Sequence, residues 1–275
     1  MTLSTIRNNP AKQKKVKTKK QKAIAATCAV AFWLLMWHVV SLCVGSELVL
    51  VSPVKVVQTL FTVIFDPDFL KTVWYSAARI LGGFFTALTL GTVLGWVASR
   101  FWVVETLLRP ITAVIKATPV ASFIILVLLW FSGKNLSVII SMLMVFPVIY
   151  MNILEGIRSA DEKLLEMAQV FRLSVGKKLL YIYLPSVAPF FVSACSVSLG
   201  LCWKSGIAAE VIGTPDGSIG AVFYQAKIFL QTSELLAWTV VVVAVSVAFE
   251  KLFMFLLRLV LKKLKMEDVL NGKRA

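Results

Sequence analysis

The chain has 275 residues, of which 59% are hydrophobic, with a formal net charge of +15 and a mean hydropathy of +0.84. This composition excludes an ordinary soluble domain and indicates spanning helices joined by short polar connections. Nucleic acid is not an expected partner, because the basic residues stand between apolar runs, where orientation in a lipid bilayer explains them.

Six apolar runs are predicted to cross the membrane, which makes the fold class all-α integral membrane. They cover residues 23–44, 72–99, 111–131, 136–154, 189–209 and 235–257. The first is too long for a signal peptide and has no small-residue cleavage site, so we expect it to be retained. The third is interrupted at Thr118-Pro119, which predicts a bent or re-entrant helix inside the bundle, since unsatisfied backbone cannot face lipid. We therefore expect residues 23–260 to form one transmembrane domain.

The connections between these runs are predicted from their polar and turn-forming residues. Residues 100–109 are expected to form a loop, 133–135 a tight turn and 213–220 an irregular loop. Residues 54–65 and 221–230 are expected to form short helices outside the spans. The second span is rich in glycines that allow close helix contact. They are Gly82, Gly83, Gly91 and Gly95.

The longest polar, helix-competent segment between two apolar runs is residues 159–185. Ser159 and Glu162 have the spacing of a capping box, which predicts the start of a helix. A second short helix is expected after Gly176 and should end by Pro185, because proline cannot donate the helical hydrogen bond. Apolar and polar side chains recur on different faces of the first helix. An amphipathic hairpin of this kind is expected to dock on a soluble partner.

The distribution of lysine and arginine predicts the orientation. With both termini in the cytoplasm, the inside segments hold 21 basic residues and the outside segments hold four. The tails, residues 1–22 and 261–275, are then basic and cytoplasmic. This asymmetry follows the positive-inside rule and places residues 159–185 on the cytoplasmic side.

Catalytic and metal-binding motifs are absent from the sequence. It contains no GxxxxGK[ST] phosphate loop, no HExxH zinc motif and no GxSxG nucleophile elbow, and it has a single histidine. The four cysteines lack metal-ligand spacing. We therefore expect no enzyme activity, no cofactor and no metal site, and the leading class is a channel or transporter component.

The fifth span is the most polar of the six and is our candidate for the translocation path. Its polar residues are Ser193, Ser196, Ser198, Lys204 and Glu210. Lys204 is suited to attract an anionic solute. Packing of small residues between helices explains the serines equally well, so both interpretations stay open.

Five residues of the segment 159–185 form a recognisable pattern: Glu166, Ala168, Ile182, Leu184 and Pro185. This pattern resembles the EAA loop of bacterial ABC importer permeases, and the second span, residues 72–100, resembles that of the nitrate, sulfonate and taurine permeases. Similarity extends over residues 30–260 and includes Arg79, Arg109-Pro110 and Ala209-Glu210. Two positions depart from the family pattern: Met167 replaces an alanine, and Arg172 stands where a glycine is usual. Since arginine adopts positive φ at a cost, we expect a turn of different shape there unless Gly176 compensates.

The resemblance implies the type I importer permease fold, in a bacterial inner (plasma) membrane. It implies a second permease subunit, as a homodimer, two ABC ATPase subunits and an extracytoplasmic solute-binding protein, with a small anion as solute. In that family the loop couples transport to the ATPase, so Glu166 is expected to be the coupling carboxylate, Ala168 to allow close docking and Pro185 to fix re-entry into the membrane. The alternative is an ion-gradient-driven transporter, which needs carboxylates inside the spans. Glu210 and Glu250 are expected near span ends and not inside the spans, which weakens this alternative.

Overall fold

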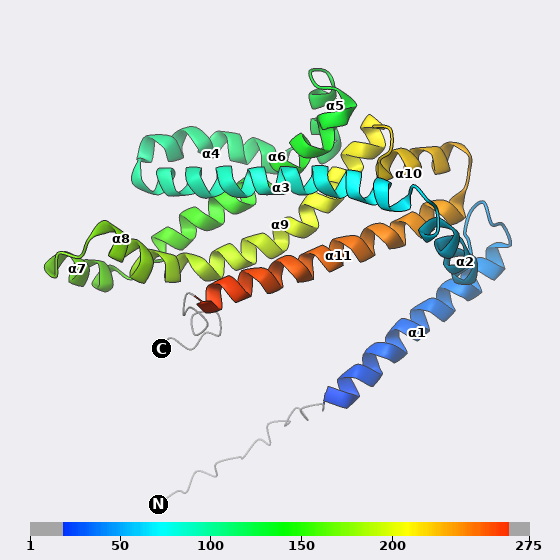
Figure 1. Ribbon diagram of the computed structural model, residues 1–275, viewed down its shortest axis with the longest axis horizontal. Helices are drawn as coiled ribbons and strands as arrows, with labels where there is room; N and C mark the ends of the chain where they lie inside the picture. Colours follow the sequence, from blue (N-terminus) through cyan, green and yellow to red (C-terminus); the bar gives the residue numbers. More distant parts are fainter. Residues whose placement is uncertain (1–18, 264–275) are drawn as a thin grey trace, which may run out of the picture. The chain divides into compact units, whose positions relative to one another are not determined.

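The computed structural model describes residues 19–263, which contain helices and no strand. The predicted tails, residues 1–22 and 261–275, lie mostly outside this range. The described residues divide between Lys55 and Val56 into two compact units, each described here by itself. The helices (Figure 1) are α1 Lys19–Val44, α2 Pro53–Ile64, α3 Phe69–Arg100, α4 Trp102–Ala117, α5 Val120–Leu128, α6 Gly133–Arg158, α7 Glu162–Val170, α8 Val175–Lys178, the π-helix η1 Leu179–Tyr183, α9 Leu184–Gly213, α10 Ile219–Ile228 and α11 Thr232–Lys263.

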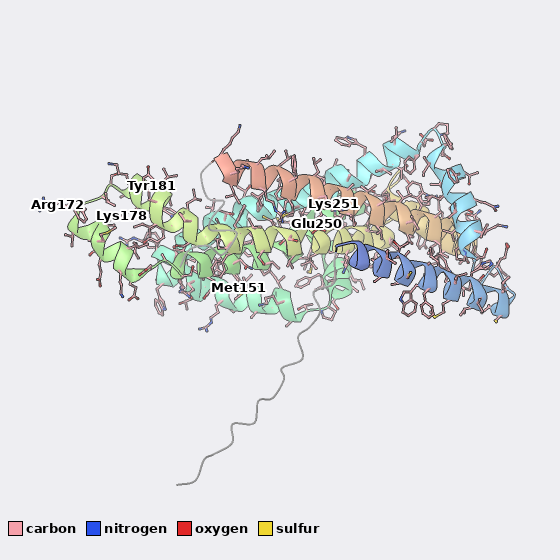
Figure 2. All side chains as sticks on the ribbon, turned by 90° about the horizontal axis from the view of Figure 1, so that it is seen from below. Met151, Arg172, Lys178, Tyr181, Glu250 and Lys251 are labelled. Carbon is pink, nitrogen blue, oxygen red and sulfur yellow. The ribbon has the colours of Figure 1, made fainter. Side chains whose placement is uncertain are left out.

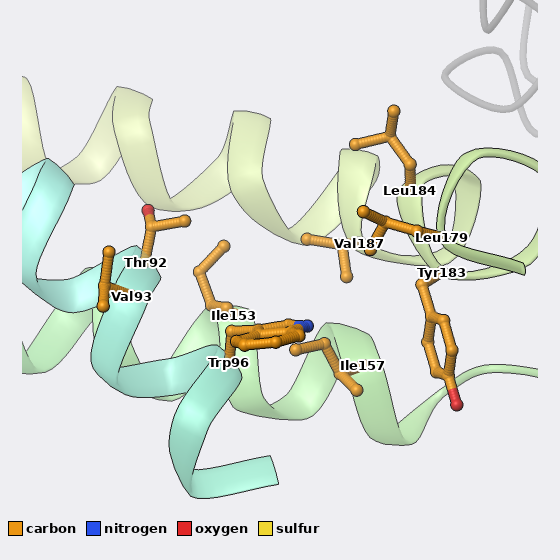
Figure 3. A pocket seen from close by; sticks show the side chains of 9 residues that line it. All are labelled: Thr92, Val93, Trp96, Ile153, Ile157, Leu179, Tyr183, Leu184 and Val187. Atoms are coloured by element: carbon orange, nitrogen blue, oxygen red, sulfur yellow. The ribbon is translucent and has the colours of Figure 1, made fainter. Parts of the chain in front are cut away.

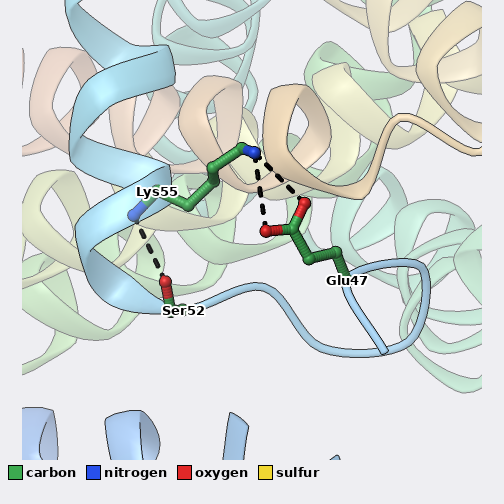
Figure 4. A network of polar contacts seen from close by, with 3 residues as sticks. All are labelled: Glu47, Ser52 and Lys55. Atoms are coloured by element: carbon green, nitrogen blue, oxygen red, sulfur yellow. Dashed lines mark hydrogen bonds and ion pairs between the residues drawn. The ribbon is translucent and has the colours of Figure 1, made fainter. Parts of the chain in front are cut away.

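The first unit consists of α1 and the segment that leads into α2. Ile24–Val44 is long and apolar enough to span a membrane, and most of its side chains are exposed, as expected of a helix that faces lipid. The following segment is held by polar contacts (Figure 4). The Lys55 ammonium lies 3.1 Å from Glu47 Oε2, and the Lys55 backbone N–H donates to Ser52 Oγ at 3.4 Å. These contacts hold the first turn of α2. The helix itself, Pro53–Ile64, confirms the short helix predicted at residues 54–65.

Within the described residues, five helices are long and apolar enough to cross a membrane. The pair α4 and α5 passes the same test together but is bent by 106°. This bend falls at Thr118-Pro119, so the predicted interruption is confirmed. With the bent pair counted as one span, the six predicted segments are all present.

The core of the second unit lies where α3, α6 and α9 run side by side (Figure 1). Ile80 and Phe84 of α3, Ile149 of α6 and Leu199 of α9 are buried in one cluster. Helices α3 and α6 approach closely because α3 presents glycines to α6. A Cβ at Gly83, Gly91 or Gly95 would lie within 3.0 Å of α6 atoms, whereas one at Gly82 would meet nothing within 4 Å. The predicted role of the glycines is thus confirmed for three of the four.

Two predicted connections are wrong. Residues 100–109 are not a loop, because the chain reverses at Phe101 alone, with φ −121° and ψ 104°, and α4 starts at Trp102. Residues 133–135 are not a separate turn but the first residues of α6, which follows the extended Ser132. Both segments looked like connections because of their polar or turn-forming residues. The predicted helix at 221–230 and the irregular loop before it are present as α10 and residues 214–218.

Candidate functional site

The hairpin at residues 159–185 projects beyond the ends of α6 and α9, and α10 lies at the opposite end of α9 (Figure 1). Arg172 lies at its tip, and Lys178 and Tyr181 follow along the second arm toward α9 (Figure 2). At its base, the Arg158 guanidinium donates to the Glu105 carboxylate and so joins the end of α6 to α4. The hairpin therefore begins from a fixed point on the bundle.

The hairpin has a small hydrophobic core of its own. Ala168 is fully buried, and it packs with Ala160 and Ile182. Leu173 and Tyr183 cover this cluster. A larger side chain at position 168 would separate the two arms, so the small size of Ala168 is explained by packing within the hairpin. The core makes α7 and the segment after it one rigid piece.

The predicted capping box at Ser159 and Glu162 is wrong. Ser159 ends α6, and its hydroxyl donates to the Gly156 carbonyl oxygen at 2.8 Å. Asp161 is the N-cap of α7, where its carboxylate accepts the Lys163 backbone N–H at 2.9 Å. Ser159 and Asp161 are both residue types that cap helices well. Asp161, which is nearer to α7, is the one that caps it.

The turn after α7 keeps the shape that glycine would give, although its residue is arginine. Arg172 has φ +48°, in the left-handed region. The Leu173 N–H donates to the Ala168 carbonyl at 2.9 Å, and the Arg172 N–H donates to the Gln169 carbonyl at 3.0 Å. These two bonds form a Schellman motif. The expectation of a different turn is therefore wrong, and Gly176 does not compensate, since it lies in α8 without positive φ.

Replacing Arg172 with glycine should raise the stability of the hairpin. A non-glycine residue in the left-handed region costs about 1 kcal/mol, which glycine avoids. We expect Arg172→Gly to protect α7 amides from hydrogen exchange, with up to about fivefold slower exchange. Leu230→Gly is a matched control, because Leu230 has φ +54° after α10, and it should slow exchange in α10 only. Faster exchange in α7 of Arg172→Gly would contradict this account of the turn.

The second arm does not end at Pro185 as predicted. α8, η1 and α9 follow one another without a gap, and Pro185 lies in the first turn of α9, buried. The Leu184 N–H donates to the Leu179 carbonyl across the wider π turn. This turn changes the hydrogen-bond register just before the proline and lets the helix continue. Leu184 is half-buried beside it.

The hairpin exposes several large apolar side chains as well as charged ones, and Glu166 lies next to them along α7. We call these residues the docking patch: Glu166, Met167, Val170, Phe171 and Val175, all exposed. Val170 and Val175 are 80% and 81% exposed. Glu166 makes no ion pair with any residue that the structure describes. Exposed apolar groups gathered on a rigid hairpin are typical of a protein-binding surface.

The predicted path residues of α9 do not share one face. Ser193 and Lys204 are exposed and lie three helical turns apart on the same side. The Ser196 hydroxyl donates to Glu250 Oε1 of α11 at 3.0 Å, beside a cavity of about 360 Å³ that Lys251 and Arg258 also line. Figure 2 shows Glu250 and Lys251 along α11. Glu250 was expected near a span end, but α11 continues to Lys263, so it lies inside the helix.

The other two predicted path residues, Ser198 and Glu210, are fully buried. The Ser76 hydroxyl of α3 donates to Glu210 Oε2 at 2.6 Å, and the Gly220 N–H donates to the same oxygen at 3.3 Å. Ser76 Oγ also accepts the Ile219 N–H at 2.9 Å. Glu210 thus lies at the N-terminus of α10, where backbone N–H groups favour an anion.

This buried cluster joins α3, α9 and α10, and neither Ser76 nor Gly220 was found from the sequence. Ser76 and Glu210 are 134 positions apart, so no local pattern connects them. The sequence showed only one member of the cluster, the carboxylate Glu210 at the end of an apolar run. Because the cluster is enclosed, we interpret Glu210 as a residue that positions α10.

Removing the Ser76 hydroxyl should destabilise the bundle. Ser76→Ala leaves a buried carboxylate oxygen with one donor fewer, which costs about 1.5–3 kcal/mol. Ser205→Ala is the matched control, because Ser205 is buried but bonds only to carbonyls of its own helix. We expect a lower midpoint of SDS-induced unfolding for Ser76→Ala alone. Equal midpoints for the two variants would show that the cluster contributes nothing to stability.

Residues 87–266 match the model of a family described as the inner membrane component of binding-protein-dependent transport systems. This match covers more than half of the chain. The chain belongs to this family. It is a type I ABC importer permease, a multi-pass bacterial membrane protein and a transport subunit, and its family has no enzymatic role.

Several relatives resemble this permease over about three quarters of its length. An aliphatic sulfonates transport permease protein of Bacillus subtilis, SsuC, is 29% identical over 77% of this chain and 77% of its own. The taurine transport system permease protein TauC of Escherichia coli is 27% identical over 78% and 80%. The nitrate import permease protein NrtB of Synechococcus elongatus is 26% identical over 75% and 84%.

Proposed function

We propose that this permease forms the solute pathway of an ATP-driven importer and is coupled to a separate ATPase through residues 159–185. The observation that carries the proposal is the docking patch, where exposed apolar side chains lie next to a carboxylate, Glu166, that makes no ion pair with the described residues, on a hairpin with a core of its own. A chain without a phosphate loop needs an external source of energy. Ala168 and Ile182 form the core of the hairpin, and Arg172 closes its turn. Leu184 and Pro185 attach the hairpin to the start of α9, where Leu184 packs against Ala188 and Leu261.

The proposed assembly contains two copies of this permease, two ATPase subunits and an extracytoplasmic binding protein. Closure of the ATPases would move the hairpins, and the helices joined to them would open the bundle to alternate sides. The exposed side of α9, with Ser193 and Lys204, is the proposed wall of the pathway between the two copies. The 21 to 4 distribution of basic residues supports cytoplasmic termini.

The proposed solute is a small anion. The relatives' names refer to sulfonates, taurine and nitrate. Lys204 on the exposed side of α9 supplies a positive charge for such a solute. Family membership favours this function over an ion-gradient-driven transporter, although Glu210 and Glu250 lie within helices.

Uptake by reconstituted vesicles tests the proposal. The permease is reconstituted with the ATPase and the binding protein from the same genome. The vesicles should transport labelled taurine, an alkanesulfonate or nitrate only when ATP is present on the side of the membrane that carries the ATPase. Collapse of proton and sodium gradients with ionophores should leave uptake intact. Uptake that follows an ion gradient without ATP would refute the proposal, and failure of the ATPase to co-purify would refute the coupling role.

A further inference from the structure

An apolar groove opens on the second unit near the hairpin (Figure 3). Its volume is about 540 Å³, within the range of roughly 300–1,000 Å³ for ligand sites. α3 contributes Trp96, α6 contributes Ile157, and the segment from η1 into α9 contributes Leu179 and Tyr183. Every other lining side chain is aliphatic except that of Thr92. The groove therefore suits a hydrocarbon chain.

A second cavity, of about 410 Å³, shares four lining residues with the groove, so the two are continuous. The shared residues are Trp96, Ile157, Leu179 and Tyr183. This second cavity has a mixed lining that includes two cations, Arg100 at the end of α3 and Lys178 at the end of α8. Neither forms an ion pair with the part of the chain that the structure describes.

The two cavities together place cations at one end, aromatic side chains in the middle and aliphatic side chains at the other end. Headgroups, aromatic residues and acyl chains have the same order across a membrane interface. Trp96 and Tyr183 are amphipathic and separate the apolar groove from the charged mouth, as aromatic residues do at the headgroup level. Basic pockets between transmembrane helices bind anionic lipid headgroups. The N-terminal segment of the chain is a poorer occupant, because residues 7–22 carry eight cations of the same sign as the mouth.

We propose that this groove, with Arg100 and Lys178 at its mouth, is a binding site for one anionic phospholipid. An acyl chain lies between α3, α6 and α9, and the phosphodiester lies between the two cations. The lipid fills the space between the bundle and η1, where the hairpin joins α9. The site needs only the membrane location of the permease and does not depend on the proposed solute or ATPase.

Native mass spectrometry of the assembled transporter tests the site with two lipids of identical chains, dioleoylphosphatidylglycerol and dioleoylphosphatidylcholine. The wild-type protein should retain the anionic lipid with a preference of about tenfold or more, since each nearby cation favours an anionic lipid. Arg100→Gln with Lys178→Gln should abolish the preference. The control, Lys163→Gln with Lys177→Gln, removes two exposed cations of the hairpin outside both cavities and should keep it.

A second variant tests the hydrocarbon part of the site. Val187→Trp should fill the groove and lower retention of both lipids, whereas the charge variant should lower retention of the anionic lipid only. Equal retention of the two lipids by the wild-type protein would overturn the proposal. Cross-linking of Trp96→Cys to a second protein chain in place of lipid would also overturn it.

Discussion

Glu166→Lys is expected to abolish ATP-driven uptake while the permease still inserts and folds. Glu166 is exposed, makes no ion pair with the described residues and stands among the apolar side chains of the docking patch. Under the proposed coupling role, reversal of its charge places a cation where the ATPase is proposed to accept a carboxylate, and such a juxtaposition costs several kcal/mol. We expect uptake to fall by about a hundredfold or more, measured in vesicles with equal amounts of permease.

The control for this prediction is Glu155→Lys. Glu155 is exposed near the end of α6, outside the hairpin, and undergoes the same change of charge. A cation is favourable at a helix C-terminus, so this variant should fold and transport normally. Normal uptake by Glu166→Lys would end the coupling role, and equal losses in both variants would show that the effect is one of net charge.

Gly220→Ala is expected to prevent α10 from packing against α9. A Cβ at this position would lie 2.2 Å from Glu210 Cβ, 2.3 Å from its backbone carbon and 2.5 Å from Val211 N. Backbone atoms of α9 cannot move away without breaking the buried cluster around Glu210. Overpacking of this kind costs about 3 kcal/mol or more. The midpoint of SDS-induced unfolding and the yield of folded permease should both fall.

Gly82→Ala serves as the control, because a Cβ there meets nothing within 4 Å. This variant should unfold at the same SDS concentration as the wild type or slightly higher, since alanine is the better helix former. If Gly220→Ala unfolds no earlier than Gly82→Ala, then α10 is not held against Glu210 in the membrane.

The spans were predictable from the sequence because each depends on a property of neighbouring residues. A long apolar run identifies a spanning helix, and Thr118-Pro119 marks the break between α4 and α5, since proline disfavours helix before it. The helix ends were less predictable. Ser159 and Asp161 are both good capping residues, and which one caps α7 depends on where α6 ends. Helix continuation through Pro185 required the π turn of η1, for which the sequence has no simple signal.

The candidate hairpin was located from the sequence, but its inner contacts were not. Its family residues divide into two groups that the sequence does not distinguish: Ala168 and Ile182 are buried, whereas Glu166 is exposed. The left-handed conformation of Arg172 was not expected from the sequence. Its energetic cost is offset by the two hydrogen bonds of the Schellman motif and by the packing of Leu173, and these contacts are visible only in the folded hairpin. The buried cluster of Ser76, Glu210 and Gly220 depends on contacts between distant parts of the chain, which only the folded structure reveals.

The continuous helical segment Val175–Gly213 has a geometric consequence for transport. With 39 residues at 1.5 Å each, it is about 58 Å long. If one end serves as the pivot, a rotation of only about 5° displaces the other end by about 5 Å, close to the pitch of one helical turn. A very small reorientation at one end of this segment is thus sufficient to shift its other end by about one helical turn.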